Sequence, residues 1–198
     1  MIPVQPQPEP EEFNKRVRTP GNRFLTEIPV PTSNQWKGKE YWRRVLPEMR
    51  RGYKGICAYS AHWISHSTGN HSVDHFVPKV QAPQLAYEWS NFRYVATRFN
   101  SRKGIRSILD PFTLAPNWFI IDFASLYIKP NPDLLPEQKQ AVVDTIACLK
   151  LNEDDDLVAE RDAWVYDYRV GGIPFSHVRK RAPFIAHELE RQGLLRER

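Results

Sequence analysis

Long hydrophobic runs are missing from this 198-residue sequence. No stretch reaches the roughly 18 consecutive apolar residues that a membrane-spanning helix requires, so we expect no membrane span. The first residues, 1–10, are polar and rich in proline, and they lack the apolar segment of a secretory signal. From these two absences we expect a cytoplasmic protein.

Cysteine is also scarce, since the chain holds only Cys57 and Cys148. Two cysteines so far apart do not form the disulfide framework of a small secreted domain, and we expect both to be reduced thiols. Neither lies in a C-x-x-C pair of the kind that holds structural zinc.

Charge is present but unevenly distributed. Residues 1–110 hold 17 Lys/Arg against 9 Asp/Glu, a net charge of +8, whereas residues 111–198 carry −3. A basic segment of this kind suits a polyanionic partner such as nucleic acid, although many basic surfaces bind none.

The first part of the chain is expected to form an extended arm, a helix and two strands. Seven prolines within residues 1–35 fix φ and predict an extended N-terminal arm. Apolar residues at helical spacing predict a helix over 36–52. Residues 54–79 are predicted to form two short strands joined by a turn at 67–70.

Further along, Ser90 suits a helix N-cap and Gly104 a helix end, which predicts a helix from Ser90 to Lys103. The apolar run at 118–123 is expected to be a buried strand or a short helix. One or two helices are expected over 135–165 and a last helix, interrupted by Pro183, over 176–198. We therefore expect an α+β fold in three segments: an arm and helix at 1–50, a core at 51–110 and a helical layer at 111–198.

Three side chains within 71–104 suit phosphodiester hydrolysis. That reaction needs a base to deprotonate water and a cation to meet the charge on the phosphate. His75 offers a base with an ordinary pKa near 6.5, and Asp74 and Asn100 offer the hard oxygen ligands that a divalent ion prefers. If Asn91 and Asn100 share one helix, they lie half a turn out of phase, so Asn91 is expected to hold the preceding loop through amide hydrogen bonds.

The spacing of these residues makes up an extended motif. The sequence reads Asp74-His75-x-x-Pro78-Lys79, then Tyr87-x-Trp89-x-Asn91, then Asn100-x-x-Lys103-Gly104. This pattern resembles the signature of HNH endonucleases, whose core is a ββα-metal unit. The looser pattern Asp144-Thr145-Ile146-x-x-Leu149-x-Leu151-Asn152, with Arg161, is similar to the C-terminal part of HNH proteins from bacterial anti-phage systems, including the Septu type.

The resemblance implies roles for each motif residue. His75 is expected to be the general base, Asp74 and Asn100 to bind one Mg²⁺ or Mn²⁺, and Asn91 to brace the catalytic loop. Lys103 matches a basic position near the scissile phosphate. Many HNH proteins also hold a zinc ion between two C-x-x-C pairs. Because only Cys57 of those four positions is a cysteine here, no structural zinc is expected.

The expected partner is nucleic acid, most simply DNA, in defence against phage or foreign DNA. Contacts with phosphates are expected from Lys79, Arg98, Arg102 and Lys103. Three alternatives stay open: a binding module that does not cut, a toxin-like effector that cleaves RNA, and a nuclease subunit that is active only with the ATPase of a defence system.

Overall fold

The computed structural model describes residues 1–196, which divide into two compact units. The N-terminal unit comprises Gln5–Gly55 and Ile64–Ser107. The C-terminal unit comprises Met1–Val4, Ile56–Trp63 and the chain from Ile108 onward. Most of the predicted arm and most of the predicted core therefore belong to the same unit.

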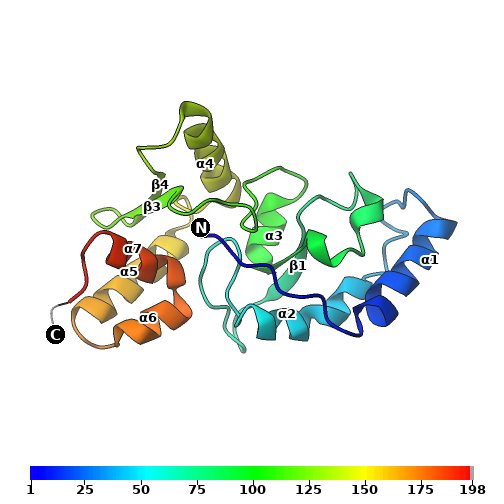
Figure 1. The fold of residues 1–198 in the computed structure, drawn as a ribbon, viewed down its shortest axis with the longest axis horizontal. Helices are drawn as coiled ribbons and strands as arrows, with labels where there is room; N and C mark the ends of the chain where they lie inside the picture. The colour runs from blue at the N-terminus through cyan, green and yellow to red at the C-terminus, as the bar shows by residue number, and fades with distance from the viewer. Residues whose placement is uncertain (197–198) are drawn as a thin grey trace. The chain divides into compact units, whose positions relative to one another are not determined.

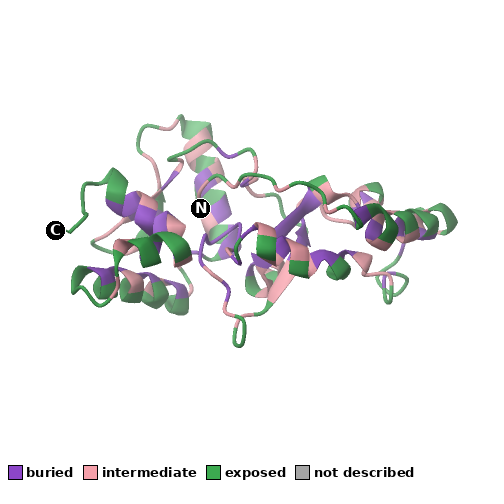
Figure 2. Ribbon diagram, turned by 60° about the horizontal axis from the view of Figure 1, so that its bottom comes forward, coloured by how far each residue is buried: buried purple, intermediate pink, exposed green. Residues whose placement is uncertain are grey.

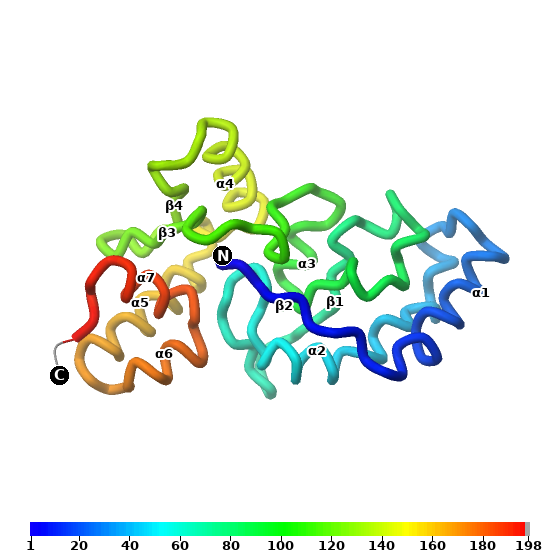
Figure 3. Tube along the Cα trace, in the orientation of Figure 1, coloured from blue at the N-terminus to red at the C-terminus, as the bar shows by residue number. Residues whose placement is uncertain are grey.

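The N-terminal unit is built around a strand, a second strand and a helix in that order. Strand β1 (His71–His75) pairs antiparallel with β2 (Phe92–Ala96), and α3 (Thr97–Lys103) follows β2 directly and packs against both strands (Figures 1 and 3). In the register of this ladder, His75 lies opposite Phe92 and Asp74 opposite Arg93.

The helix predicted from Ser90 to Lys103 is wrong in its first half. Ser90 lies in a short 3-10 turn, η4 (Trp89–Asn91), and the following five residues form β2. Phe92, Val95 and Phe99 stand at i, i+3 and i+7, the spacing of one helix face, and all three are buried, but the first two belong to a strand and the third to a helix. Gly104 ends α3 as expected, with a φ of 55°.

The strand predicted near Cys57 is also wrong. Ile56 and Trp63 form one isolated antiparallel bridge, and the residues between them make a tight loop in which the Cys57 N–H donates to the His62 carbonyl at 2.8 Å. The partner of β1 therefore comes from residues that follow it in the sequence.

The predicted extended arm is partly helical. Residues Asn14–Arg18 form η1, a π-helix, and Thr19–Glu27 form α1, whose first turn accommodates Pro20. The expected helix at 36–52 is split into η2 (Tyr41–Val45) and α2 (Leu46–Gly52), with Pro47 in the first turn of α2. Three aromatic side chains from this part of the chain, Phe24, Trp36 and Trp42, pack in sequence against one another. Trp42 also packs against Tyr87 of the loop that follows β1.

In its described residues, the C-terminal unit combines a hairpin with four helices. Its elements are β3 (Phe119–Asp122), β4 (Tyr127–Pro130), α4 (Pro136–Leu149), α5 (Asp155–Arg169), α6 (Phe175–Arg181) and α7 (Pro183–Arg191). The strand alternative for 118–123 is confirmed. Pro183 starts a new helix, α7, which is buried along most of its length (Figure 2). The single helix predicted over 176–198 is therefore two helices, the second of which ends at Arg191. Residues 197 and 198 of that prediction lie outside the described part of the chain.

The described chain is an α+β structure with two small antiparallel sheets, as expected at that level. None of the helices in residues 1–196 has the length and apolar character needed to cross a membrane.

Candidate active site

The three side chains expected to act together line one cavity. Asp74 and His75 come from the end of β1, and Asn100 comes from the middle of α3. All three border a cavity of about 230 Å³, which we call the active-site cavity after the role that the motif resemblance implies for these residues. Its remaining lining is Pro78, Lys79, Val80, Gly104 and Ile105. His75 is the last residue of β1, so the alternation of side chains along the strand ends where the loop begins.

His75 is held in one orientation by a backbone hydrogen bond. Its Nε2 lies 2.9 Å from the carbonyl oxygen of Ala86, which follows a 3-10 turn, η3 (Pro83–Leu85). A carbonyl oxygen only accepts, so Nε2 carries the proton and Nδ1 keeps the lone pair that a general base requires. The rings of Trp42 and Phe92 meet the imidazole edge-on at centroid distances of 4.6 and 5.4 Å.

Burial controls the protonation of His75. The side chain is 8% exposed, and this burial is the largest cause lowering its pKa from 6.5 to about 4. The hydrogen bond to Ala86 opposes the shift, while the positive charges of Lys79 and Lys103 add to it. The imidazole is therefore neutral at pH 7 and able to accept a proton.

Asn91 fixes the loop that carries the Ala86 carbonyl. Its Oδ1 accepts from the Val77 N–H at 2.8 Å, and its Nδ2 donates to the carbonyls of Val77 and Leu85 at 3.0 and 3.2 Å. These bonds confirm the expected loop-holding contacts, although Asn91 precedes a strand and does not share a helix with Asn100. Asn91 is thus a positioning residue for His75.

Lys103 is an internal partner of Asp74. Its ammonium lies 3.3 Å from Oδ1 and 3.2 Å from Oδ2 of Asp74, and 3.0 Å from the His75 carbonyl oxygen. Lys103 is fully buried and Asp74 is 2% exposed. The expected contact of Lys103 with a phosphate is therefore corrected to a buried ion pair.

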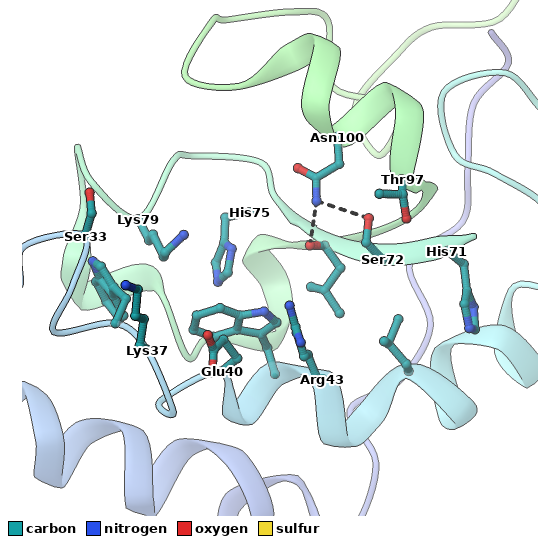
Figure 4. A pocket seen from close by; sticks show the side chains of 14 residues that line it. Ser33, Lys37, Glu40, Arg43, His71, Ser72, His75, Lys79, Thr97 and Asn100 are labelled. Atoms are coloured by element: carbon teal, nitrogen blue, oxygen red, sulfur yellow. Dashed lines mark hydrogen bonds between the residues drawn. The ribbon is translucent and has the colours of Figure 1, made fainter.

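Asn100 is oriented by two hydrogen bonds. Its Nδ2 donates to Ser72 Oγ and to the Val73 carbonyl, both at 3.1 Å (dashed in Figure 4). Because the amide nitrogen is used in this way, Oδ1 is the atom of Asn100 that is left to accept a hydrogen bond or to ligate a cation.

The donor set can be compared with what a metal ion needs. No group of three or more His, Cys, Asp or Glu side chains within residues 1–196 is placed to hold a metal ion. Mg²⁺, however, commonly takes one or two protein oxygens and fills its octahedron with water and phosphate oxygens. One carboxylate and one amide oxygen on a single cavity fit that pattern, with the Lys103 ammonium competing for the same carboxylate.

The residues expected to contact nucleic acid are separated by the structure. Lys79 is half-buried and lines the active-site cavity, whereas Arg98 is exposed and Arg102 half-exposed on α3. The described lining of that cavity includes neither arginine.

A second cavity of about 560 Å³ adjoins the first through His75, Lys79 and Asn100. It adds two exposed cationic residues that the motif does not contain, Lys37 and Arg43. The sequence did not identify Arg43 as part of this site, because nothing in its spacing links it to β1.

Comparison with known proteins adds no assignment. No protein-family model matches the chain, and no curated protein matches it either.

Proposed function

We propose that this protein is a divalent-metal-dependent HNH endonuclease that hydrolyses phosphodiester bonds. The observation that carries the proposal is the single cavity bordered by Asp74, His75 and Asn100 on a strand–strand–helix frame. A base and two hard oxygen donors around one space are the groups that this hydrolysis requires.

In this proposal His75 takes the proton from the attacking water at Nδ1. The Ala86 carbonyl holds the opposite nitrogen, so the protonated ring that forms is a donor at both nitrogens and keeps its place. The surrounding rings of Trp42 and Phe92 limit rotation of the imidazole. Asn91 maintains the loop geometry on which that hydrogen bond depends.

Asp74 and Asn100 would hold the cation. When bound there, Mg²⁺ or Mn²⁺ supplies positive charge that stabilises the phosphate and the departing oxygen. Lys103 neutralises Asp74 in the absence of other cations, so the buried carboxylate is never left without a counter-charge.

We propose DNA as the substrate and defence against phage or foreign DNA as the setting, on the motif resemblance alone. The basic charge of residues 1–110 supports a nucleic-acid partner of either kind.

The test is a plasmid-nicking assay with Mn²⁺ or Mg²⁺, with and without EDTA, run in parallel on a labelled RNA. We expect EDTA-sensitive cleavage by the native protein and its loss in His75→Ala. His66→Ala, which changes an exposed histidine of the same unit, serves as the control and is expected to cleave normally. Equal cleavage by His75→Ala in clean preparations would contradict the role of His75 as general base. Cleavage of RNA alone would show that the substrate is RNA and not DNA.

A further inference from the structure

The larger of these two cavities lies between the segment 33–46 and strand β1. We call it the arm cavity. Figure 4 shows Lys37, Glu40 and Arg43 on one side and Ser72, His75, Lys79 and Asn100 on the other. Its volume of about 560 Å³ falls within the range of roughly 300–1,000 Å³ typical of small-molecule sites.

Among the charged residues of this lining, cations outnumber anions. Lys37, Arg43 and Lys79 line the cavity together with one carboxylate, that of Glu40. The two histidines of the lining, His71 and His75, have lowered pKa values because of burial and are neutral at pH 7. An excess of fixed positive charge in a recess raises the local concentration of anions.

The rest of the lining is apolar and aromatic. Trp36, Trp42, Leu46 and Val73 border the cavity. The Lys79 ammonium lies 5.5 Å from the Trp42 ring centroid and 5.7 Å from that of Trp36, so cationic and aromatic groups share one wall. Cations beside flat apolar surface are the combination that proteins use for single-stranded nucleic acid.

We infer that the arm cavity binds one unpaired nucleotide of the strand to be cut. Its phosphate is held by Arg43 and Lys37, and its base lies against the wall of Trp42, Leu46 and Val73. His75 and Asn100 border both cavities, so a nucleic-acid strand that passes from one cavity to the other runs past His75, the proposed general base. A base pair with its two backbones exceeds the space that this cavity offers, which favours single-stranded or locally unpaired substrate over intact duplex.

The inference rests on the proposed function only in naming the bound strand as substrate, since binding can be measured without cleavage. The probe is a 5′-fluorescein 12-nucleotide DNA of mixed sequence, followed by fluorescence anisotropy with the full chain in EDTA. Arg43→Gln and Lys37→Gln are compared with Arg51→Gln, which removes an exposed charge of the same unit outside the arm cavity.

We expect each cavity variant to weaken binding about ten-fold, the effect of losing one charge-assisted hydrogen bond. Each should also reduce the slope of log affinity against log salt by about 0.7. Arg51→Gln should change affinity less than two-fold. A 12-mer of abasic sites, with the same phosphates and no bases, should bind about ten-fold more weakly than the normal oligonucleotide.

The outcomes separate the two proposals. Cavity-dependent binding with no cleavage under any metal condition supports this inference and contradicts the nuclease. Equal losses in Arg51→Gln and Arg43→Gln contradict the inference, because the charge would then act non-specifically. If duplex DNA binds as tightly as the single strand, with the same dependence on Arg43, the cavity does not select an unpaired nucleotide. If the abasic strand binds as tightly as the normal one, the cavity holds no nucleobase.

Discussion

Replacing Lys103 by methionine tests both the buried ion pair and the metal site. Methionine keeps much of the length of the side chain but removes the ammonium that lies 3.2 and 3.3 Å from the two oxygens of Asp74. Since Asp74 is 2% exposed and Lys103 fully buried, the carboxylate is left in a poorly solvated position. Breaking a buried ion pair on one side costs about 3–5 kcal/mol, and we expect this loss in the free energy of unfolding measured with urea.

Divalent ions should reverse part of that loss. A cation in this cavity would compete with the Lys103 ammonium for Asp74 in the native protein, and Lys103→Met removes that competitor. A ligand that binds only the folded state at a hundred times its dissociation constant stabilises by about 2.7 kcal/mol. We therefore expect Mn²⁺ to stabilise Lys103→Met by about 2–3 kcal/mol and the native protein by less.

Two controls make this result decisive. Lys15→Met changes an exposed lysine and should alter stability by no more than about 0.5 kcal/mol. The double variant Asp74→Asn, Lys103→Met removes the proposed metal ligand and should show no Mn²⁺ effect. If Mn²⁺ stabilised that double variant as much as Lys103→Met, or if Lys103→Met were as stable as the native protein, the reasoning would be refuted.

Two further predictions concern His75 and its support. Because the pKa of His75 is about 4 in the folded chain against 6.5 for the free side chain, the unfolded state binds more protons between these values. The share of stability that His75 contributes should therefore fall by about 3 kcal/mol as pH drops from 6.5 to 4, and His75→Gln should remove this share in urea titrations; an unchanged slope would contradict the assignment. Asn91→Ala loses three hydrogen bonds, so the free energy of unfolding should fall by about 2–4 kcal/mol. It should also lower kcat more than it raises KM in nicking assays; a change in KM alone would indicate a substrate contact instead.

Local patterns predicted the position of β1 and α3 better than the pairing between strands. Phe92, Val95 and Phe99 satisfy a helical spacing, but a buried strand followed at once by a helix buries the same three positions. The pairing of β1 with β2 crosses the loop 76–91, so it depends on tertiary contacts that no short window contains. The prolines of residues 1–35 suggested an extended arm, but Pro20 lies in the first turn of α1, where no backbone N–H donor is needed and a proline is compatible with a helix.

For the site, motif spacing predicted three residues that border one cavity, Asp74, His75 and Asn100. It did not predict that Lys103 would be buried, since a lysine at this spacing is equally compatible with an exposed helix face. Nor could it place Arg43 in the same cavity as His75, because residues 33–46 meet β1 through tertiary packing, such as that of Trp42 against His75, which no short window contains.

The central claim is that Asp74 and Asn100 hold one divalent cation beside His75. A crystal structure of the protein soaked in Mn²⁺, with anomalous data, tests it most directly. We predict one anomalous peak in the active-site cavity, within about 2.5 Å of an Asp74 oxygen and of Asn100 Oδ1. Manganese bound elsewhere, with Lys103 still on Asp74 and no peak in that cavity, would contradict the claim.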